Sequence, residues 1–155
     1  MMGYGALRKG RFSEENRVYF VTTVTHDRRK FFTDFQLART VIGVMKQLDD
    51  EGYVSSFSWV LMPDHLHWLF QLGNGSNKFE PTLSVVMKRL KAISAQRINV
   101  YLDRQGSVWQ KAFYDHGLRD GEDIQQLARY IVANPLRAGL VECIGDYPHW
   151  DAAWL

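Results

Sequence analysis

The chain has 155 residues, of which 46% are apolar, and its 19 Lys and Arg residues against 17 Asp and Glu residues leave a net charge of +2. This balance is typical of an ordinary globular protein of one domain, and the single cysteine excludes an intramolecular disulfide and a cysteine-based metal cluster. No apolar run reaches the length of a membrane span and the N-terminus lacks the apolar core of a secretory signal, so we expect a cytoplasmic protein with no membrane partner.

The predicted elements alternate between strands and helices along the chain. β-Branched and aromatic residues predict strands over residues 17–25, 54–62, 66–72 and 108–118. Apolar residues at helical spacing predict helices over 34–50, 81–101 and 122–133, the first capped by Asp34 and the last stopped by Pro135. We expect a single domain over residues 1–155, with a basic tail over 1–16 and a C-terminal extension over 136–155.

This order of elements predicts a fold of the α+β class. Strand, helix, strand, strand, helix, strand is the ferredoxin-like pattern, in which two helices cover one face of an antiparallel sheet. The helix over 122–133 is then an extra C-terminal element. We expect the other face of the sheet to be left free to carry a site.

Two histidines lie two residues apart at the start of the predicted strand over 66–72. His67 is within the strand and His65 is the residue just before it. Alternate residues of a strand point to the same side, so His65 and His67 share one face, with Cα atoms about 6.6 Å apart. Two imidazoles at this spacing can converge on one divalent ion. Leu66, Trp68 and Phe70 alternate onto the opposite face and are apolar enough to pack against helices. Two exposed histidines on a surface strand would give the same pattern.

The predicted C-terminal helix carries a tyrosine and an asparagine four residues apart. Tyr130 and Asn134 lie on one flank of its apolar stripe, where side chains can reach an adjoining sheet. Asn134 could supply an amide oxygen as a third metal ligand while Tyr130 presents its hydroxyl to a bound phosphate. Taken separately, such a tyrosine is usually a packing residue, and an asparagine before a proline is usually a helix cap.

The basic residues gather in three places, as a surface that binds phosphates requires. The candidate DNA-binding residues in these clusters are Arg8, Lys9, Arg11, Arg28, Arg29, Lys88 and Lys91. Any one cluster alone could equally be a solvated run of charge.

Segments spread over nearly the whole chain resemble the REP-associated tyrosine transposases, a branch of the HUH single-tyrosine transposases. The segments are Leu-Arg-Lys-Gly-Arg at 7–11, the strand at 19–25, Pro-Asp-His-Leu-His at 63–67, Val-Trp-Gln-Lys at 108–111, Tyr-Asp-His at 114–116 with Leu-Arg at 118–119, and Tyr-Ile-Val-Ala-Asn-Pro at 130–135. Each segment alone is a weak signal, whereas their order and spacing together are specific.

The resemblance implies a bacterial, nucleoid-associated enzyme that cuts and rejoins single-stranded DNA carrying a small REP-like hairpin. It implies that His65, His67 and Asn134 hold a divalent metal ion, Mg²⁺ or Mn²⁺, with Leu66 between the two histidines. It also implies that Tyr130 is the nucleophile and forms a 5′-phosphotyrosine intermediate. Asn at position 134 is common in this branch, whereas related single-tyrosine transposases have Gln there.

Two alternatives of different classes remain open from the residues. One is a metal-dependent hydrolase that uses the two histidines and a carboxylate such as Asp64, without a covalent intermediate. The other is a non-catalytic, RRM-like module that binds nucleic acid, although its typical aromatic pattern is missing. Tyr114 is the second candidate for the nucleophile, and His116 could assist the reaction or simply make a structural hydrogen bond. Monomer and homodimer are both compatible with the sequence.

Overall fold

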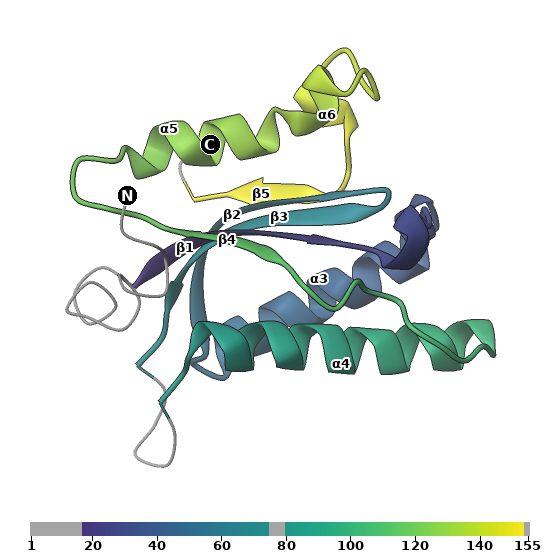
Figure 1. Ribbon diagram of the computed structural model, residues 1–155. Helices are drawn as coiled ribbons and strands as arrows, with labels where there is room; N and C mark the ends of the chain where they lie inside the picture. Colours follow the sequence, from purple (N-terminus) through teal and green to yellow (C-terminus); the bar gives the residue numbers. More distant parts are fainter. Residues whose placement is uncertain (1–16, 75–79, 154–155) are drawn as a thin grey trace.

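The centre of the computed structural model, which describes residues 17–74 and 80–153, is a five-stranded antiparallel sheet (Figure 1). The strand order is β4-β1-β3-β2-β5, and every pairing is antiparallel. The strands are β1 (Val18–Val24), β2 (Val54–Met62), β3 (His65–Leu72), β4 (Tyr114–Gly117) and β5 (Trp150–Ala152). Without β5, this order is that of the ferredoxin-like fold, so the predicted fold class is confirmed.

Two long helices cover one face of the sheet, α3 (Phe35–Asp50) and α4 (Leu83–Leu102). The predicted cap of α3 is confirmed, because the Asp34 carboxylate accepts hydrogen bonds from the backbone N–H groups of Gln36 and Leu37. None of the helices within the described residues is both long and apolar enough to cross a membrane.

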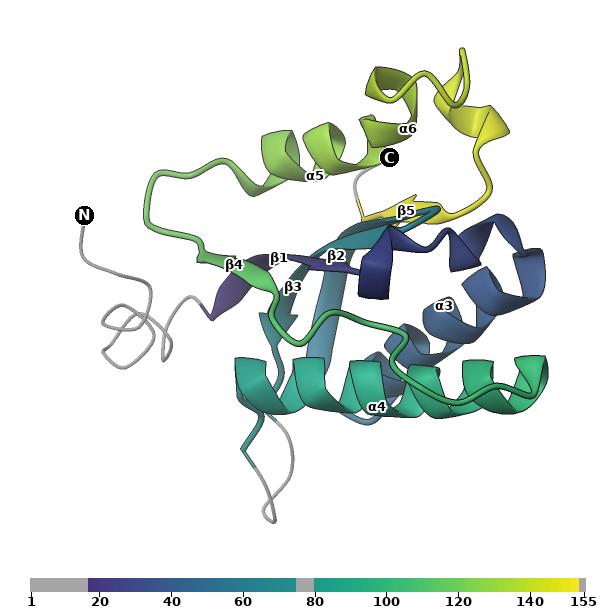
Figure 2. The same ribbon diagram turned by 45° about the vertical axis from the view of Figure 1, so that its right-hand side comes forward.

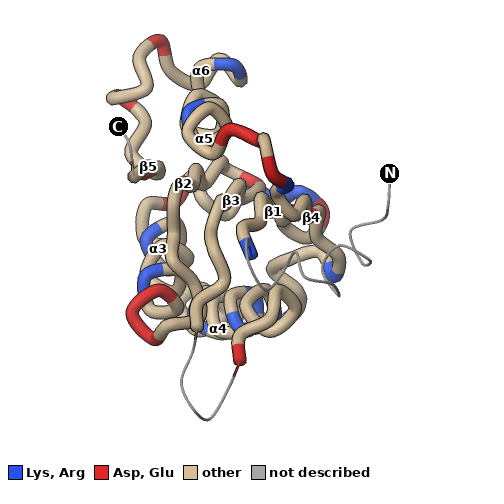
Figure 3. The backbone as a smooth tube through the Cα atoms, turned by 90° about the vertical axis from the view of Figure 1, so that its left-hand side faces the viewer, with Lys and Arg blue, Asp and Glu red and all other residues tan. Residues whose placement is uncertain are grey.

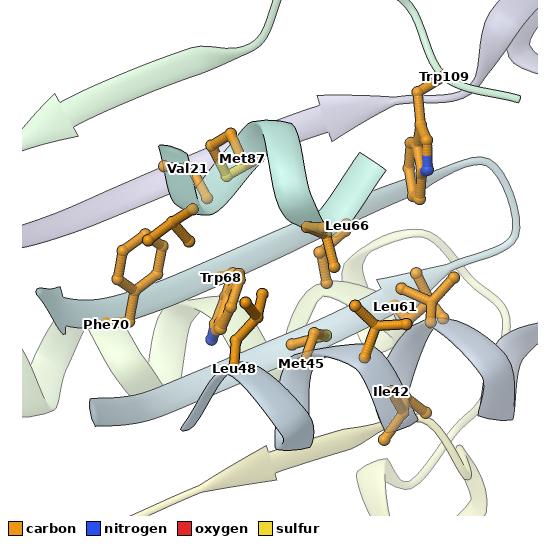
Figure 4. Close-up of a cluster of buried hydrophobic side chains, with 14 of the residues drawn as sticks. Val21, Ile42, Met45, Leu48, Leu61, Leu66, Trp68, Phe70, Met87 and Trp109 are labelled. Atoms are coloured by element: carbon orange, nitrogen blue, oxygen red, sulfur yellow. The ribbon is translucent and has the colours of Figure 1, made fainter. Parts of the chain in front are cut away.

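The main hydrophobic core lies between this face and the two helices. Leu66, Trp68 and Phe70 of β3 point into it and are fully buried, as their alternation predicts (Figure 4). The indole N–H of Trp68 still has a partner, because it donates to the Ser56 hydroxyl at 2.9 Å. The core therefore holds the backbone of β3 in place from one face, and this fixes the positions from which side chains project on the opposite face.

The second face of the sheet is half covered, which corrects the expectation that it is free. Helix α5 (Ile124–Val132) lies across it, followed by the short α6 (Asn134–Arg137) (Figure 2). A smaller apolar cluster fills the space beneath α5, to which Leu69 of β3 and Ile131 of α5 contribute. The Ser58 hydroxyl of β2 donates to the Ala128 carbonyl at 3.1 Å and joins the helix to the sheet.

Three element boundaries differ from the sequence prediction. The fourth strand begins only at Tyr114. Before it, Trp109 forms an isolated bridge with Thr25, and the carbonyls of residues 110, 111 and 112 accept hydrogen bonds from Lys91 of α4. The C-terminal extension adds a strand, β5, to the edge of β2. Helix α5 ends at Val132, before Pro135 as predicted, but an unpredicted short helix, α6, follows with Pro135 in its first turn, where its missing N–H is tolerated. The remaining short helices are η1 (His26–Arg28), η2 (Phe31–Thr33) and η3 (Ile144–Asp146).

Candidate active site

The histidine pair projects from the start of β3 onto the face that carries α5. His65 and His67 are both half-buried, and their ring centroids lie 4.8 Å apart. They are adjacent because β3 turns back from β2 immediately before His65, and the strand then places every second residue on this face. The predicted convergence of the two rings is therefore present in the structure.

Each imidazole is held in place through its Nδ1 atom. Nδ1 of His67 lies 2.7 Å from the Thr22 hydroxyl of β1, its partner in the sheet register. Nδ1 of His65 lies 2.7 Å from a carboxylate oxygen of Asp64. In the tautomer that donates from Nδ1, each ring keeps Nε2 with its lone pair for a ligand, which is the arrangement usual for metal-bound histidines. The pair therefore fits a divalent ion.

Asp64 is itself fixed by a second partner. Its other carboxylate oxygen accepts a hydrogen bond from Nε of Arg28 at 3.2 Å. Burial works to raise the pKa of Asp64, but the hydrogen bond and positive charge of His65, with the charge of Arg28, outweigh it and lower the pKa. Arg28 and its neighbour Asp27 have φ values of 51° and 55°, a left-handed conformation that costs about 1–3 kcal/mol at a non-glycine residue. The chain is thus strained where it supports His65.

His67 is neutral at physiological pH. Its burial, the charge of His65 and the charge of Arg137 together lower its pKa from 6.5 to about 4. A neutral imidazole is the form that binds metal ions, because the protonated ring has no free lone pair.

Tyr130 lies near the C-terminal end of α5 and is 59% exposed. Ala128 and Ile131 face the sheet and are buried, so the predicted apolar stripe is confirmed and Tyr130 lies on its flank. The guanidinium of Arg137 lies 3.8 Å from the centre of the Tyr130 ring, and its Nη1 donates to the Tyr130 carbonyl at 2.7 Å. The Arg137 side chain therefore contacts both the ring and the backbone of Tyr130.

Asn134 begins α6 and is half-buried, one turn beyond Tyr130. Among the described residues, no three His, Cys, Asp or Glu side chains come together in a metal-binding group. The amide oxygen of Asn134 remains the predicted third protein ligand beside His65 and His67.

The two supporting candidates of β4 have different surroundings. Tyr114 is opposite Thr22 in the sheet register and packs its ring edge-on against Phe20, whose ring also contacts His67. His116 has Nε2 at 3.0 Å from both carboxylate oxygens of Glu122, in the loop before α5. His116 thus ties β4 to that loop, which agrees with the structural role left open by the sequence.

The candidate DNA-binding cations do not form one surface. Arg28 and Arg29 precede η2, and there Arg29 lies over the Phe31 ring at 4.9 Å. Lys88 and Lys91 belong to α4, on the face of the sheet opposite the histidines (Figure 3). Three carbonyls already occupy the three donors of Lys91, whereas Lys88 is exposed. The predicted residues Arg8, Lys9 and Arg11 lie outside the described residues.

Three supporting residues were missed by sequence reasoning. Thr22 could have been found from the alternation of β1, which places it on the face of the histidines once the register is known. Arg28 was predicted only as a DNA contact, whereas in the structure its Nε donates to the Asp64 carboxylate. Arg137 carried no signal, because it follows Pro135, where the helix was expected to have ended.

Comparison with known proteins supports a transposase. The family model described as "Transposase IS200 like" matches residues 14–134. A REP-associated tyrosine transposase of Escherichia coli K12 is 25% identical over 92% of this chain and 83% of its own length. A Haemophilus influenzae protein assigned to the same group is 27% identical over 85% of this chain and 77% of its own. A solved REP-associated tyrosine transposase bound to a REP hairpin shares the fold, with a TM-score of 0.68, 21% identity, and coverage of 87% of this chain and 76% of the other.

Proposed function

The chain belongs to the IS200-like transposase family, and we propose that it cuts and rejoins single-stranded DNA beside a small hairpin. The proposal is supported by the names of its relatives and by the REP hairpin bound to the structural neighbour. One observation within this chain carries it. His65 and His67 project together, each fixed through Nδ1, onto the sheet face that is crossed by α5, the helix that carries Tyr130.

The histidine pair provides the electrophilic side of the proposed reaction. We infer that Nε2 of His65, Nε2 of His67 and the amide oxygen of Asn134 would hold Mg²⁺ or Mn²⁺. When bound, such an ion supplies polarisation of the scissile phosphate and offsets the charge that builds up in the transition state. The contacts of Thr22 and Asp64 with the Nδ1 atoms restrain the orientation of the two rings.

Tyr130 provides the nucleophile. Its hydroxyl oxygen forms a bond to phosphorus while the bond from phosphorus to the 3′-oxygen breaks, leaving a 5′-phosphotyrosine and a free 3′-hydroxyl. The proton that leaves Tyr130 is balanced by the proton that the 3′-oxygen gains. Because the phosphodiester energy is kept in the new bond, a second 3′-hydroxyl can reverse the step and join a new strand without ATP.

The surroundings of Asp64 disfavour the hydrolase alternative. That alternative needs a carboxylate oxygen of Asp64 as a metal ligand beside the histidines. Both oxygens already have partners, because one lies 2.7 Å from Nδ1 of His65 and the other accepts from Arg28. These contacts support a role for Asp64 in orienting His65.

The deciding experiment uses the full chain, a hairpin oligonucleotide with single-stranded flanks, and Mg²⁺ or Mn²⁺. We expect cleavage and a denaturant-resistant protein–DNA adduct, with mass spectrometry placing the phosphate on the peptide that contains Tyr130. Tyr130→Phe should abolish both while hairpin binding survives, since the lost oxygen costs the fold at most about 0.5–1.5 kcal/mol. His65→Ala and His67→Ala should also abolish both.

Tyr114→Phe is the matched control, because it removes the same oxygen from the other exposed tyrosine near the site. We expect it to leave the adduct intact. An adduct on Tyr114 would move the nucleophile within the same enzyme class. Cleavage without an adduct on any tyrosine would instead support the hydrolase alternative. Cleavage by His65→Ala at the wild-type rate would contradict the proposed metal site.

A further inference from the structure

The side chain of Arg137 makes contacts that a simple surface cation does not make. It stacks on the Tyr130 ring at 3.8 Å and donates from Nη1 to the Tyr130 carbonyl at 2.7 Å. One exposed residue thus touches both the ring and the backbone of Tyr130.

The break between α5 and α6 makes this contact possible. In a continuous helix, residues 130 and 137 would be separated by seven rises of about 1.5 Å, roughly 10.5 Å along the axis. Here α5 ends at Val132, and α6 begins at Asn134 with Pro135 in its first turn. The chain changes path at this point, and residue 137 comes back beside residue 130.

Tyr130 needs such a restraint. It is 59% exposed, so the apolar cluster beneath α5 does not fix its side chain, and exposed side chains exchange rotamers within nanoseconds. Attack on phosphorus requires the tyrosine hydroxyl to be held within about 0.5 Å of its reactive position. A misplacement of about 1 Å can lower the rate about 100-fold. A planar guanidinium stacked on the ring limits its rotation, which the point charge of a lysine does less well.

We propose that Arg137 is the positioning residue that holds the Tyr130 side chain in the orientation for attack. This inference rests on the proposed function. Arg137 acts through Tyr130. One of the five N–H groups of its guanidinium makes the bond to the Tyr130 carbonyl, and this bond anchors the guanidinium beside the ring. The plain alternative is that Arg137 only caps the C-terminal end of α5, where a cation is favourable for the helix dipole.

The test compares Arg137→Ala, Arg137→Gln and Arg137→Lys in the full chain with the same hairpin oligonucleotide. We expect the single-turnover rate of adduct formation to fall at least about 10-fold in Arg137→Ala and Arg137→Gln, by the loss of alignment. The Kd for the hairpin should change less than about 3-fold. Arg137→Lys should recover only part of the rate, because it restores the charge without the planar stack.

Arg129→Ala is the matched control, since Arg129 is an exposed arginine next to Tyr130 on α5 and its removal changes the net charge equally. It should leave the rate unchanged. Wild-type rates in Arg137→Ala, a rate that falls in step with the melting temperature, or equal loss in Kd and rate would overturn the proposal. Wild-type rates would mean that Arg137 has no role in the reaction. A rate that falls with the melting temperature would mean that Arg137 only caps α5, and equal losses in Kd and rate would mean that it contacts DNA.

A second measurement separates this proposal from the proposed function. With 3-fluorotyrosine incorporated, the fluorine resonance of Tyr130 reports the order of its ring in the protein without DNA. We expect the resonance to shift and its ring to become more mobile in Arg137→Ala and not in Arg129→Ala. If the wild type forms no adduct at all, the proposed function fails, whereas an unchanged resonance in Arg137→Ala overturns the positioning role.

Discussion

The two faces of the sheet differ in how completely they are covered. Helices α3 and α4 cover one face, where Trp68 and Phe70 are fully buried. Within residues 17–74 and 80–153, the other face is crossed by α5, with the short α6 after it. Beside the smaller apolar cluster under α5, the polar side chains of Thr22, His65 and His67 line the sheet. Neighbouring residues of β3 therefore serve opposite purposes, because one face provides stability and the incomplete cover of the other leaves room for chemistry.

The comparison predicts very different costs for two adjacent residues of β3. Trp68→Ala should lower the free energy of unfolding by about 3–5 kcal/mol, because it leaves a large cavity in the main core. His67→Ala, one residue earlier, should cost at most about 1.5 kcal/mol, roughly the bond to Thr22. Denaturant titration of both variants measures the difference. Equal costs would show that the second face contributes as much stability as the first.

The pH dependence of stability should also separate the two faces. The pKa of His67 is about 4 in the folded chain and near 6.5 when unfolded, so between these values the unfolded state binds more protons. Stability is therefore complete above about pH 6.5 and is lost as the pH falls toward 4, by at most about 3 kcal/mol from this group. Trp68 lies on the opposite face and has no titratable side chain, so a conservative Trp68→Phe variant should keep the same pH profile.

His67→Ala is the variant that checks this source, with metal ions removed by EDTA. Its unfolding free energy should depend less on pH between 6.5 and 4 than that of the wild type. If the two profiles are parallel, His67 is not the group responsible, and His149, whose pKa is also lowered by burial and by Arg39, becomes the next candidate.

The covered face was the part that the sequence predicted well. The alternation of Leu66, Trp68 and Phe70 is a local pattern, and burial against two amphipathic helices follows from it directly. The histidine pair was predicted for the same reason, since the spacing within one strand fixes the face. For these two features, which depend on the period and on neighbouring residues alone, the predicted face was confirmed, whereas the strand predicted over 108–118 from its local pattern begins only at Tyr114.

The half-covered face depends on contacts between distant segments, which a single sequence does not reveal. Helix α5 was predicted, but nothing local said that it would cross the open face. The β5 strand at 150–152 is too short to show a period, and it forms only because the edge of β2 offers free backbone groups. The position of Arg137 depends on the path of the chain past Pro135, which is a tertiary property.

Thr22→Val sharpens the comparison within the site, because valine keeps the shape of threonine and removes its hydroxyl. We expect the unfolding free energy to fall by about 0.5–1.5 kcal/mol, from the loss of the bond to Nδ1 of His67. The larger consequence should be a weaker affinity for Mn²⁺, by about 10- to 100-fold, because the ring loses its fixed orientation. Calorimetric titration of Mn²⁺ measures this, and Thr40→Val on the exposed side of α3 is the control. An unchanged affinity would mean that Thr22 does not orient the ring.

The smallest effect is expected at Lys88, which tests whether the α4 face takes any part in DNA binding. Lys88 is exposed, so Lys88→Ala should change the unfolding free energy by less than about 0.5 kcal/mol. If it contacts a phosphate, the dependence of log Kd on log salt should weaken by about 0.7 to 0.9 for the hairpin. Lys91→Ala should show the reverse, a loss of stability with an unchanged salt slope, because its ammonium donates to three backbone carbonyls. Unchanged slopes in both variants would confine DNA binding to the half-covered face and the segments around it.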